Sequence, residues 1–263
     1  MHSREKSLLN KFRLGGGTRY LDQTVVLSRE ALELSPQGHP GRSSPLNNLV
    51  LCLSTRYKQL GAIADLEEAI VLNREALELR PQGHPDRSLS LNNLASCLSI
   101  RYEQLGAVAD LEAAIVLNRE ALELCPQGHP DHSSPLNNLG SCLSTRYKQL
   151  GAVADLEEAI VLNREALELC PQGHPDRSLS LNNLALCLLS RYKQLGAVAD
   201  LEEAIVLNQE ALELWTQGHP DRSSPLNNLA ACLSTRYKQL GAVADLEEAI
   251  VLRSTRAAPA RTP

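Results

Sequence analysis

The sequence predicts an all-α protein, a right-handed α-α superhelix in which paired helices stack as a solenoid. The main observation is a 45-residue repeat, because residues 46–90 and 136–180 differ at only four of their 45 positions. Further copies begin at Leu91, Leu181 and Leu226, and each copy carries apolar residues at helical spacing. A fixed period of this length indicates one supersecondary unit copied head to tail, since a single copy is too small to bury its own apolar face.

Each unit is expected to begin with a helix, here called helix A, of roughly 16–19 residues. In the unit that starts at Leu91, this helix covers the stretch before Gly106. Its apolar residues recur every three or four positions and form one stripe: Leu91, Leu94, Ala95, Leu98, Tyr102 and Leu105. Glycine readily adopts the left-handed conformation that commonly follows a helix, so Gly106 is the predicted stop.

A second helix of roughly 15 residues, here called helix B, is expected after a short turn. Asp110 is its predicted N-cap, and the acidic residues of its first turn suit the positive end of the helix dipole. Its packing candidates are Leu111, Ala114, Ile115, Ala121, Leu122 and Leu124. Pro126 and Gly128 end the helix, and a Gly-His-Pro linker leads into the next unit.

Helix A is expected to begin at different places in different units. Pro135 occupies a position that holds Ser90 in the neighbouring unit. Proline suits the first position of a helix and disrupts an interior one. The expected starts are near Ser134 and Ser224 in the proline-containing units, and near Arg87 and Arg177 in the others.

The array divides into four parts. Residues 1–45 are expected to be a degenerate N-terminal repeat, and residues 46–225 four near-identical repeats. Residues 226–252 form a truncated sixth repeat, because RSTRAAPARTP replaces the rest of helix B after Leu252. Residues 253–263 are expected to be a disordered tail with few apolar side chains to bury. The unfinished repeat fits either a fragment of a longer protein or a sequence that leaves its reading frame after Leu252, and it is also a candidate surface for self-association.

Composition excludes several classes of function. The formal net charge of −5 argues against a nucleic-acid ligand, since phosphate contacts need clustered Lys and Arg. No apolar run approaches 18 residues and the N-terminus lacks a signal-peptide core, so neither a membrane span nor secretion is expected. Seven cysteines without a secretory signal indicate reduced thiols in a cytoplasmic protein.

Residue types that could take part in catalysis or bind a metal recur once per unit. Their spacing does not bring several of them together in one site. One set is a ladder of cysteines: Cys52, Cys97, Cys142, Cys187 and Cys232. One cysteine per stacked unit suits packing rather than a metal site or a disulfide. The histidines of the Gly-His-Pro linkers are expected to bond helix ends: His39, His84, His129, His174 and His219. With no nucleophile–base pair, metal cluster or phosphate loop in the pattern, we expect no enzyme and no cofactor.

The repeat unit resembles the tetratricopeptide repeat. The residues that carry the resemblance are Leu49, Val50, Gly61, Leu66, Ala69, Ala76 and Pro81, which follow the order of the family signature. The unit is about 11 residues longer than the family's usual 34. Its LNNLA-like start and Gly-His-Pro linker are similar to the long repeats of kinesin light chain, and DLEEAIVLNREALEL is similar to fungal arrays found beside CHAT or nucleotide-binding ATPase domains. The resemblance covers roughly residues 8–252.

The resemblance places a peptide-binding groove on helix A. The second asparagine of each unit aligns with a family position that often bonds a bound peptide: Asn48, Asn93, Asn138, Asn183 and Asn228. On a helical projection, Asn48 lies at about 200° from Leu46, opposite the apolar stripe. An amide side chain both donates and accepts, so it can pair with a peptide unit. The alternative is that these amides tie neighbouring helices together.

A variable position lies beside the asparagine face. It holds Leu51, Ser96, Ser141, Leu186 and Ala231 in otherwise near-identical copies. The variation fits either tuning of the groove or drift. Taken together, the pattern and the resemblance favour a scaffold that holds a peptide or protein segment in a concave groove. The alternative is a regulatory arm of a larger signalling protein with a CHAT protease-like or nucleotide-binding effector.

Overall fold

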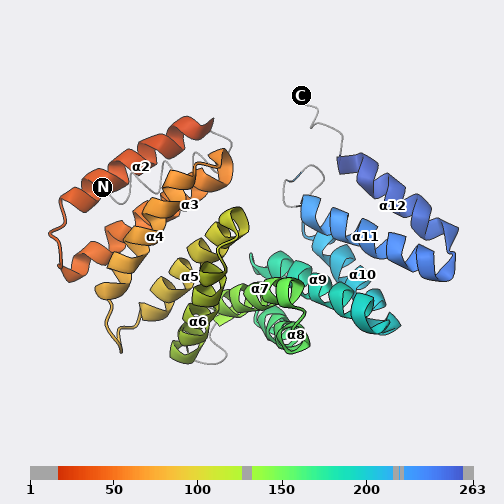
Figure 1. Ribbon diagram of the computed structural model, residues 1–263. Coiled ribbons are helices and arrows are strands. Elements are labelled where there is room, and N and C mark those ends of the chain that lie inside the picture. Colours follow the sequence, from red (N-terminus) through yellow and green to blue (C-terminus); the bar gives the residue numbers. More distant parts are fainter. Residues whose placement is uncertain (1–16, 126–131, 216–218, 220–221, 257–263) are drawn as a thin grey trace. The chain divides into compact units, whose positions relative to one another are not determined.

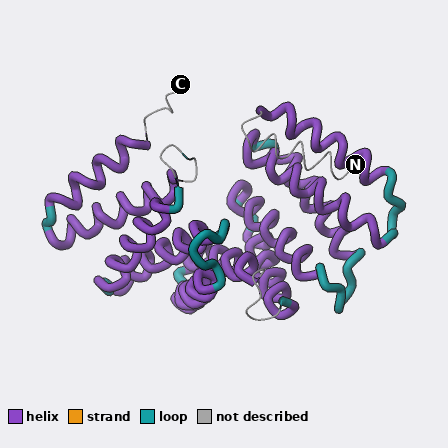
Figure 2. The backbone as a smooth tube through the Cα atoms, turned by 180° about the vertical axis from the view of Figure 1, so that it is seen from behind, coloured by secondary structure: helices purple, strands orange, loops and turns teal. Residues whose placement is uncertain are grey.

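The structure, a computed structural model, describes residues 17–125, 132–215, 219 and 222–256. Within these residues the chain forms eleven α-helices and one short 3₁₀ helix, with no β-strand (Figures 1 and 2). The chain divides into two compact units, residues 1–125 and 126–263, which are described separately. The predicted all-α class is confirmed for the described part of the chain.

The first unit contains six of these elements: α2 (Gly17–Glu33), η1 (Pro40–Arg42), α3 (Ser43–Leu60), α4 (Ile63–Glu78), α5 (Arg87–Leu105) and α6 (Val108–Leu124). The second contains α7 (Ser133–Leu150), α8 (Val153–Glu168), α9 (Arg177–Leu195), α10 (Val198–Glu213), α11 (Ser223–Leu240) and α12 (Val243–Arg256). Odd-numbered elements from α3 onward are helices A, and even-numbered ones are helices B. Each helix A packs against the helix B that follows it and the one that precedes it within its unit.

The ends of helix A and helix B were predicted with unequal success. Gly106 ends α5 in the left-handed conformation, with φ of 69°, and its N–H bonds the Tyr102 carbonyl at 2.7 Å. The predicted Asp110 cap is wrong. Helix α6 begins at Val108 after Ala107, and no side chain caps it. The Asp110 carboxylate instead binds Arg101 on α5, because an ion pair across the helix pair competes with local capping.

The start of helix A shifts in the predicted direction, by one residue. Helices α5 and α9 begin at Arg87 and Arg177, whereas α7 and α11 begin at Ser133 and Ser223, one residue later in the repeat. Pro135 is the third residue of α7 rather than the first. Proline is tolerated there because N–H groups of the first helical turn have no partner within the helix.

The core follows most of the predicted stripe. Leu91, Leu94, Ala95 and Leu98 are buried, but Leu105 is 61% exposed, so its place in the stripe was wrong. Leu105 is the last residue of α5. On helix B the buried residues are Leu111, Ala114, Ile115, Asn118 and Ala121, while Leu122 is half-buried and Leu124 is exposed.

At the C-terminal end of the array, one helix is longer than expected. Helix α12 continues to Arg256, four residues beyond Leu252, where the sixth repeat was expected to stop. No proline interrupts the sequence before Pro259, so the backbone can extend the helix. The rest of the predicted tail and residues 1–16 of the degenerate repeat lie outside the described residues. No described helix combines the length and apolar character needed to cross a membrane.

Candidate binding surface on helix A

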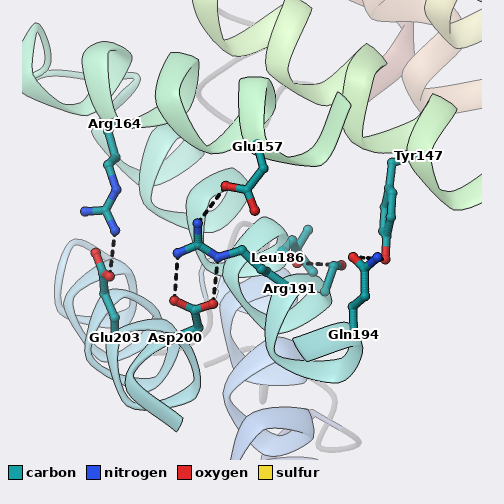
Figure 3. Close-up of polar contacts among 9 residues, drawn as sticks. Tyr147, Glu157, Arg164, Leu186, Arg191, Gln194, Asp200 and Glu203 are labelled. Carbon is teal, nitrogen blue, oxygen red and sulfur yellow. Dashed lines mark hydrogen bonds and ion pairs between the residues drawn. The ribbon is translucent and has the colours of Figure 1, made fainter. Parts of the chain in front are cut away.

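In the second unit the helices A lie closer to one another than the helices B do. Helix α9 contacts both α7 and α11, whereas α8, α10 and α12 hardly touch one another. Hydrogen bonds join successive helices A. The Tyr147 hydroxyl on α7 donates to Gln194 Oε1 on α9 at 3.1 Å (Figure 3), and the Tyr192 hydroxyl on α9 donates to Gln239 Oε1 on α11 at 2.7 Å. The closer spacing places helix A on the inner side of this unit.

All five predicted asparagines are half-buried: Asn48, Asn93, Asn138, Asn183 and Asn228. Their surroundings differ. Asn228 Nδ2 donates to Asn182 Oδ1 at 2.6 Å and so ties α11 to α9, as the alternative interpretation expects. Asn93 and Asn183 form no hydrogen bond to any described residue, and their amides are available to a ligand. The ladder therefore contains both kinds of asparagine.

The variable position is accessible in every unit. Leu51 is 46% exposed, and the equivalent residues Ser96, Ser141, Leu186 and Ala231 are half-buried. Each lies three residues after an asparagine of the ladder, which places the two on neighbouring parts of one helical face. A change at this position alters the surface beside the amides without altering the core.

Unpaired positive charge accompanies this face. Exposed lysines occupy one position near the end of helix A in four units: Lys58, Lys148, Lys193 and Lys238. Within the described residues these lysines take part in no ion pair. Neighbouring arginines behave differently, since Arg191 is bound by two carboxylates. Although the whole chain is acidic, helix A thus presents net positive charge.

The arginine near the end of each helix A forms an extensive polar cluster that the sequence pattern did not predict. Arg191 binds Asp200 through Nε and Nη2 at 2.7 and 2.8 Å, and its Nη1 binds Glu157 of the preceding repeat at 2.8 Å (Figure 3). The hydrogen bonds to Asp200 raise the pKa of Arg191 above its ordinary value. In the equivalent pair, the bonds from Arg236 lower the pKa of Asp245. The cluster joins helix A, helix B and the preceding repeat.

Buried asparagines on helix B were also missed. They are Asn73, Asn118, Asn163 and Asn208, all 0% exposed, and each has an Oδ1 atom without a hydrogen bond. Asn163 Nδ2 donates to the Ala159 carbonyl at 2.8 Å and contacts Cys187 Sγ of the next helix A at 3.6 Å. These amides lie between helices rather than on the candidate surface, so their role is in packing.

The cysteine and histidine ladders have the expected structural environments. The five ladder cysteines are buried, and none of the seven cysteines forms a disulfide. The described residues contain no group of three or more His, Cys, Asp or Glu that could hold a metal ion. Burial raises the pKa of the Cys97 and Cys187 thiols, and that of Cys232 to about 11. His84 and His174 each accept a hydrogen bond through Nδ1 from the backbone N–H two residues later, at 3.1 Å, beside the start of a helix. His129 lies outside the described residues.

These environments predict selective labelling of the thiols. Because the thiolate is the nucleophile, buried thiols with raised pKa values should react with iodoacetamide far more slowly than the half-buried Cys125. Mass spectrometry of the native protein should find Cys125 modified first, whereas the urea-unfolded chain should be modified at all seven sites. Equal labelling of Cys125 and Cys187 in the native state would contradict this assignment.

Comparisons with known proteins agree with the fold. Residues 88–132, 136–176 and 178–221 match the model of the tetratricopeptide repeat family, and no curated protein matches the sequence. Among solved structures, a kinesin light chain protein from Podosopora anserina with nearly identical tetratricopeptide-like repeats superposes with a TM-score of 0.56 at 21% identity, covering 85% of this chain and 99% of that one.

Two further structures are similar. BtubC (BKLC) from P. vanneervenii has a TM-score of 0.61 at 20% identity, covering 92% of this chain and 94% of that one. YrrB, a tetratricopeptide repeat protein with an unusual peptide-binding site, has a TM-score of 0.52 at 16% identity, covering 86% and 92%. The all-α solenoid predicted from the repeat is thus the fold of these proteins, and the chain belongs to the tetratricopeptide repeat family.

Proposed function

We propose that this protein is a non-enzymatic, cytoplasmic scaffold that holds an extended peptide or protein segment along the asparagine face of helix A. The observation that carries the proposal is an unbonded, half-buried amide in each of the two units, Asn93 in the first and Asn183 in the second. A half-buried amide without a partner leaves a donor and an acceptor that a peptide backbone can satisfy. YrrB, which shares the fold, is a protein with a peptide-binding site.

The exposed lysines indicate which charge the bound segment should carry. Lys148, Lys193 and Lys238 repeat along the second unit without carboxylate partners among the described residues. Acidic residues of a bound segment would lower the repulsion among these charges and speed its association. The preferred segment is therefore extended and carries Asp or Glu, and its binding weakens as salt rises.

The test uses peptides selected against the wild-type protein from a random 12-residue display library. The double variant Asn93→Ala/Asn183→Ala should bind them more weakly, by about 0.5–1.5 kcal/mol for each lost hydrogen bond, with an unchanged melting temperature. Calorimetric titration and thermal denaturation measure the two quantities.

Asn228→Ala is the matched control, because it removes the same side chain where the amide already bonds Asn182. It should lower the melting temperature, and the folded protein should keep more of its affinity for the peptides. If Asn93→Ala/Asn183→Ala also lowers stability while the folded fraction binds normally, the ladder is structural throughout and the proposed site is wrong.

One observation favours self-association as a second candidate function. Ile250 on α12 is 58% exposed, whereas the equivalent Ile205 on α10 is 3% exposed beneath the helix that follows it. The exposed Ile250 gives α12 an apolar surface, and the same surface of a second copy of the chain would cover it. No described residue specifically favours the regulatory arm of a larger signalling protein.

A further inference from the structure

Trp215 is the only tryptophan of the chain, and it interrupts the repeat. The equivalent position after helix B holds Ser35, Arg80, Cys125 or Cys170 in the other units. Its indole is held on two sides. Nε1 donates to Ser178 Oγ at 2.8 Å, and the ring stacks on His219 with centroids 4.3 Å apart and planes at 14°. The ring is therefore fixed before any ligand arrives.

The indole forms one wall of a cavity of about 320 Å³ between the starts of α9 and α11. Trp215, Leu179 and Pro225 supply apolar surface, and Ser178 and Asn182 supply neutral polar groups. This volume is near the lower end of the roughly 300–1,000 Å³ typical of ligand pockets. The cavity therefore suits one anchoring side chain rather than a complete cofactor.

Among the described residues, no charged side chain lines this cavity. Moving a charged group into it would remove water without supplying an ionic partner, which is costly. A second cavity, of about 360 Å³, shows the contrast, because its lining includes Arg164 and Glu203, which already bind each other at 2.7 Å. The cavity beside Trp215 thus selects for an uncharged, apolar group.

The cavity is continuous with the asparagine face. Asn182 lines it and accepts the hydrogen bond from Asn228, a member of the ladder on the adjacent helix A. A peptide backbone lying along the ladder would pass the mouth of the cavity at this point. We propose that the cavity beside Trp215 receives an uncharged apolar side chain, which anchors the bound segment in a single register. This inference rests on the proposed function.

The single tryptophan provides a direct test. The indole N–H of the full-length protein gives one resonance in a ¹⁵N–¹H NMR spectrum, and it can be followed while capped single residues are added. N-acetyl-leucinamide should shift this resonance saturably, whereas N-acetyl-aspartamide and N-acetyl-lysinamide at the same concentrations should not. Equal shifts with all three compounds, or no shift with any, would overturn the proposal.

A matched pair of variants locates the binding. Leu179→Asp places a charge in the cavity, and Leu89→Asp places the same charge at the equivalent position one double repeat earlier, where Trp215 has no counterpart. Both leucines are about half exposed, at 47% and 49%, so both variants should fold. Leu179→Asp should weaken binding of N-acetyl-leucinamide roughly tenfold, and Leu89→Asp should leave it unchanged. Equal effects would place the compound elsewhere.

The outcomes separate this inference from the proposed function. If library peptides bind in an Asn183-dependent way while capped leucine leaves the indole resonance unmoved, the anchor pocket is wrong and the groove stands. If capped leucine binds but no library peptide depends on the ladder, the pocket stands as an isolated site and the proposed function fails.

Discussion

Replacing Arg191 with alanine is expected to lower the free energy of unfolding by about 3 kcal/mol. The loss comes mainly from Asp200, which is 5% exposed and would keep its charge without the two bonds that Arg191 donates. Removing one member of a buried pair typically costs about 3–5 kcal/mol, and the 23% exposure of the Arg191 side chain favours the lower end. Urea denaturation followed by circular dichroism measures the change.

Arg164→Ala is the control for this prediction. Arg164 also binds a carboxylate of the next repeat, Glu203, at 2.7 Å, but the two side chains are 46% and 35% exposed. Exposed pairs contribute about 0–1 kcal/mol, so this variant should remain close to the wild type. If both variants lose the same stability, burial of Asp200 is not the reason for the effect.

Acid should reduce the contribution that the equivalent pair in the last repeat, Arg236 and Asp245, makes to the stability of the fold. Arg236 lowers the pKa of Asp245 in the folded state, so the unfolded chain takes up protons at a higher pH than the folded one. The pair therefore stabilises the fold above the unfolded pKa of the carboxyl, and this contribution is lost as pH falls through the folded pKa. The stability difference between wild type and Arg236→Ala should accordingly shrink in acid.

The sequence predicted the helix pairs well because the relevant signals are local and repeated. Gly106 needs only its own backbone to end α5, and Pro135 needs only the first turn of α7 to delay its start. Five copies of one pattern also reinforce each other. These signals determine where helices begin and end, and the stacking of an amphipathic pair follows from them.

The polar clusters were missed for different reasons. Asp110 satisfies the local rule for a cap, and only the packing of α6 against α5 shows that Arg101 competes for it. The buried asparagine of helix B did leave a signal, since Asn118 lies three residues after Ile115 and seven after Leu111, within the apolar stripe. The pocket at Trp215 had none, because its walls come from two helices and an intervening loop.

The apolar stripe of α5 provides a sharp test of which leucines form the core. Leu98 and Leu105 are seven residues apart on one helical face, so sequence periodicity assigns both to the interior. The structure separates them, with Leu98 3% exposed and Leu105 61% exposed. Leu98→Ala should therefore destabilise the protein by about 2–5 kcal/mol, through lost burial and the cavity that remains.

Leu105→Ala deletes the same atoms from the same helix but should change stability by no more than about 0.5 kcal/mol, because exposed substitutions leave no cavity. The comparison controls for helix propensity, since alanine replaces leucine in both variants. Urea denaturation of the two variants measures the free energy of unfolding that each has lost. A loss at Leu105 equal to that at Leu98 would mean that another surface covers the end of α5 in solution, and the exposed leucines that close the other helices A would then be candidates for the same contact.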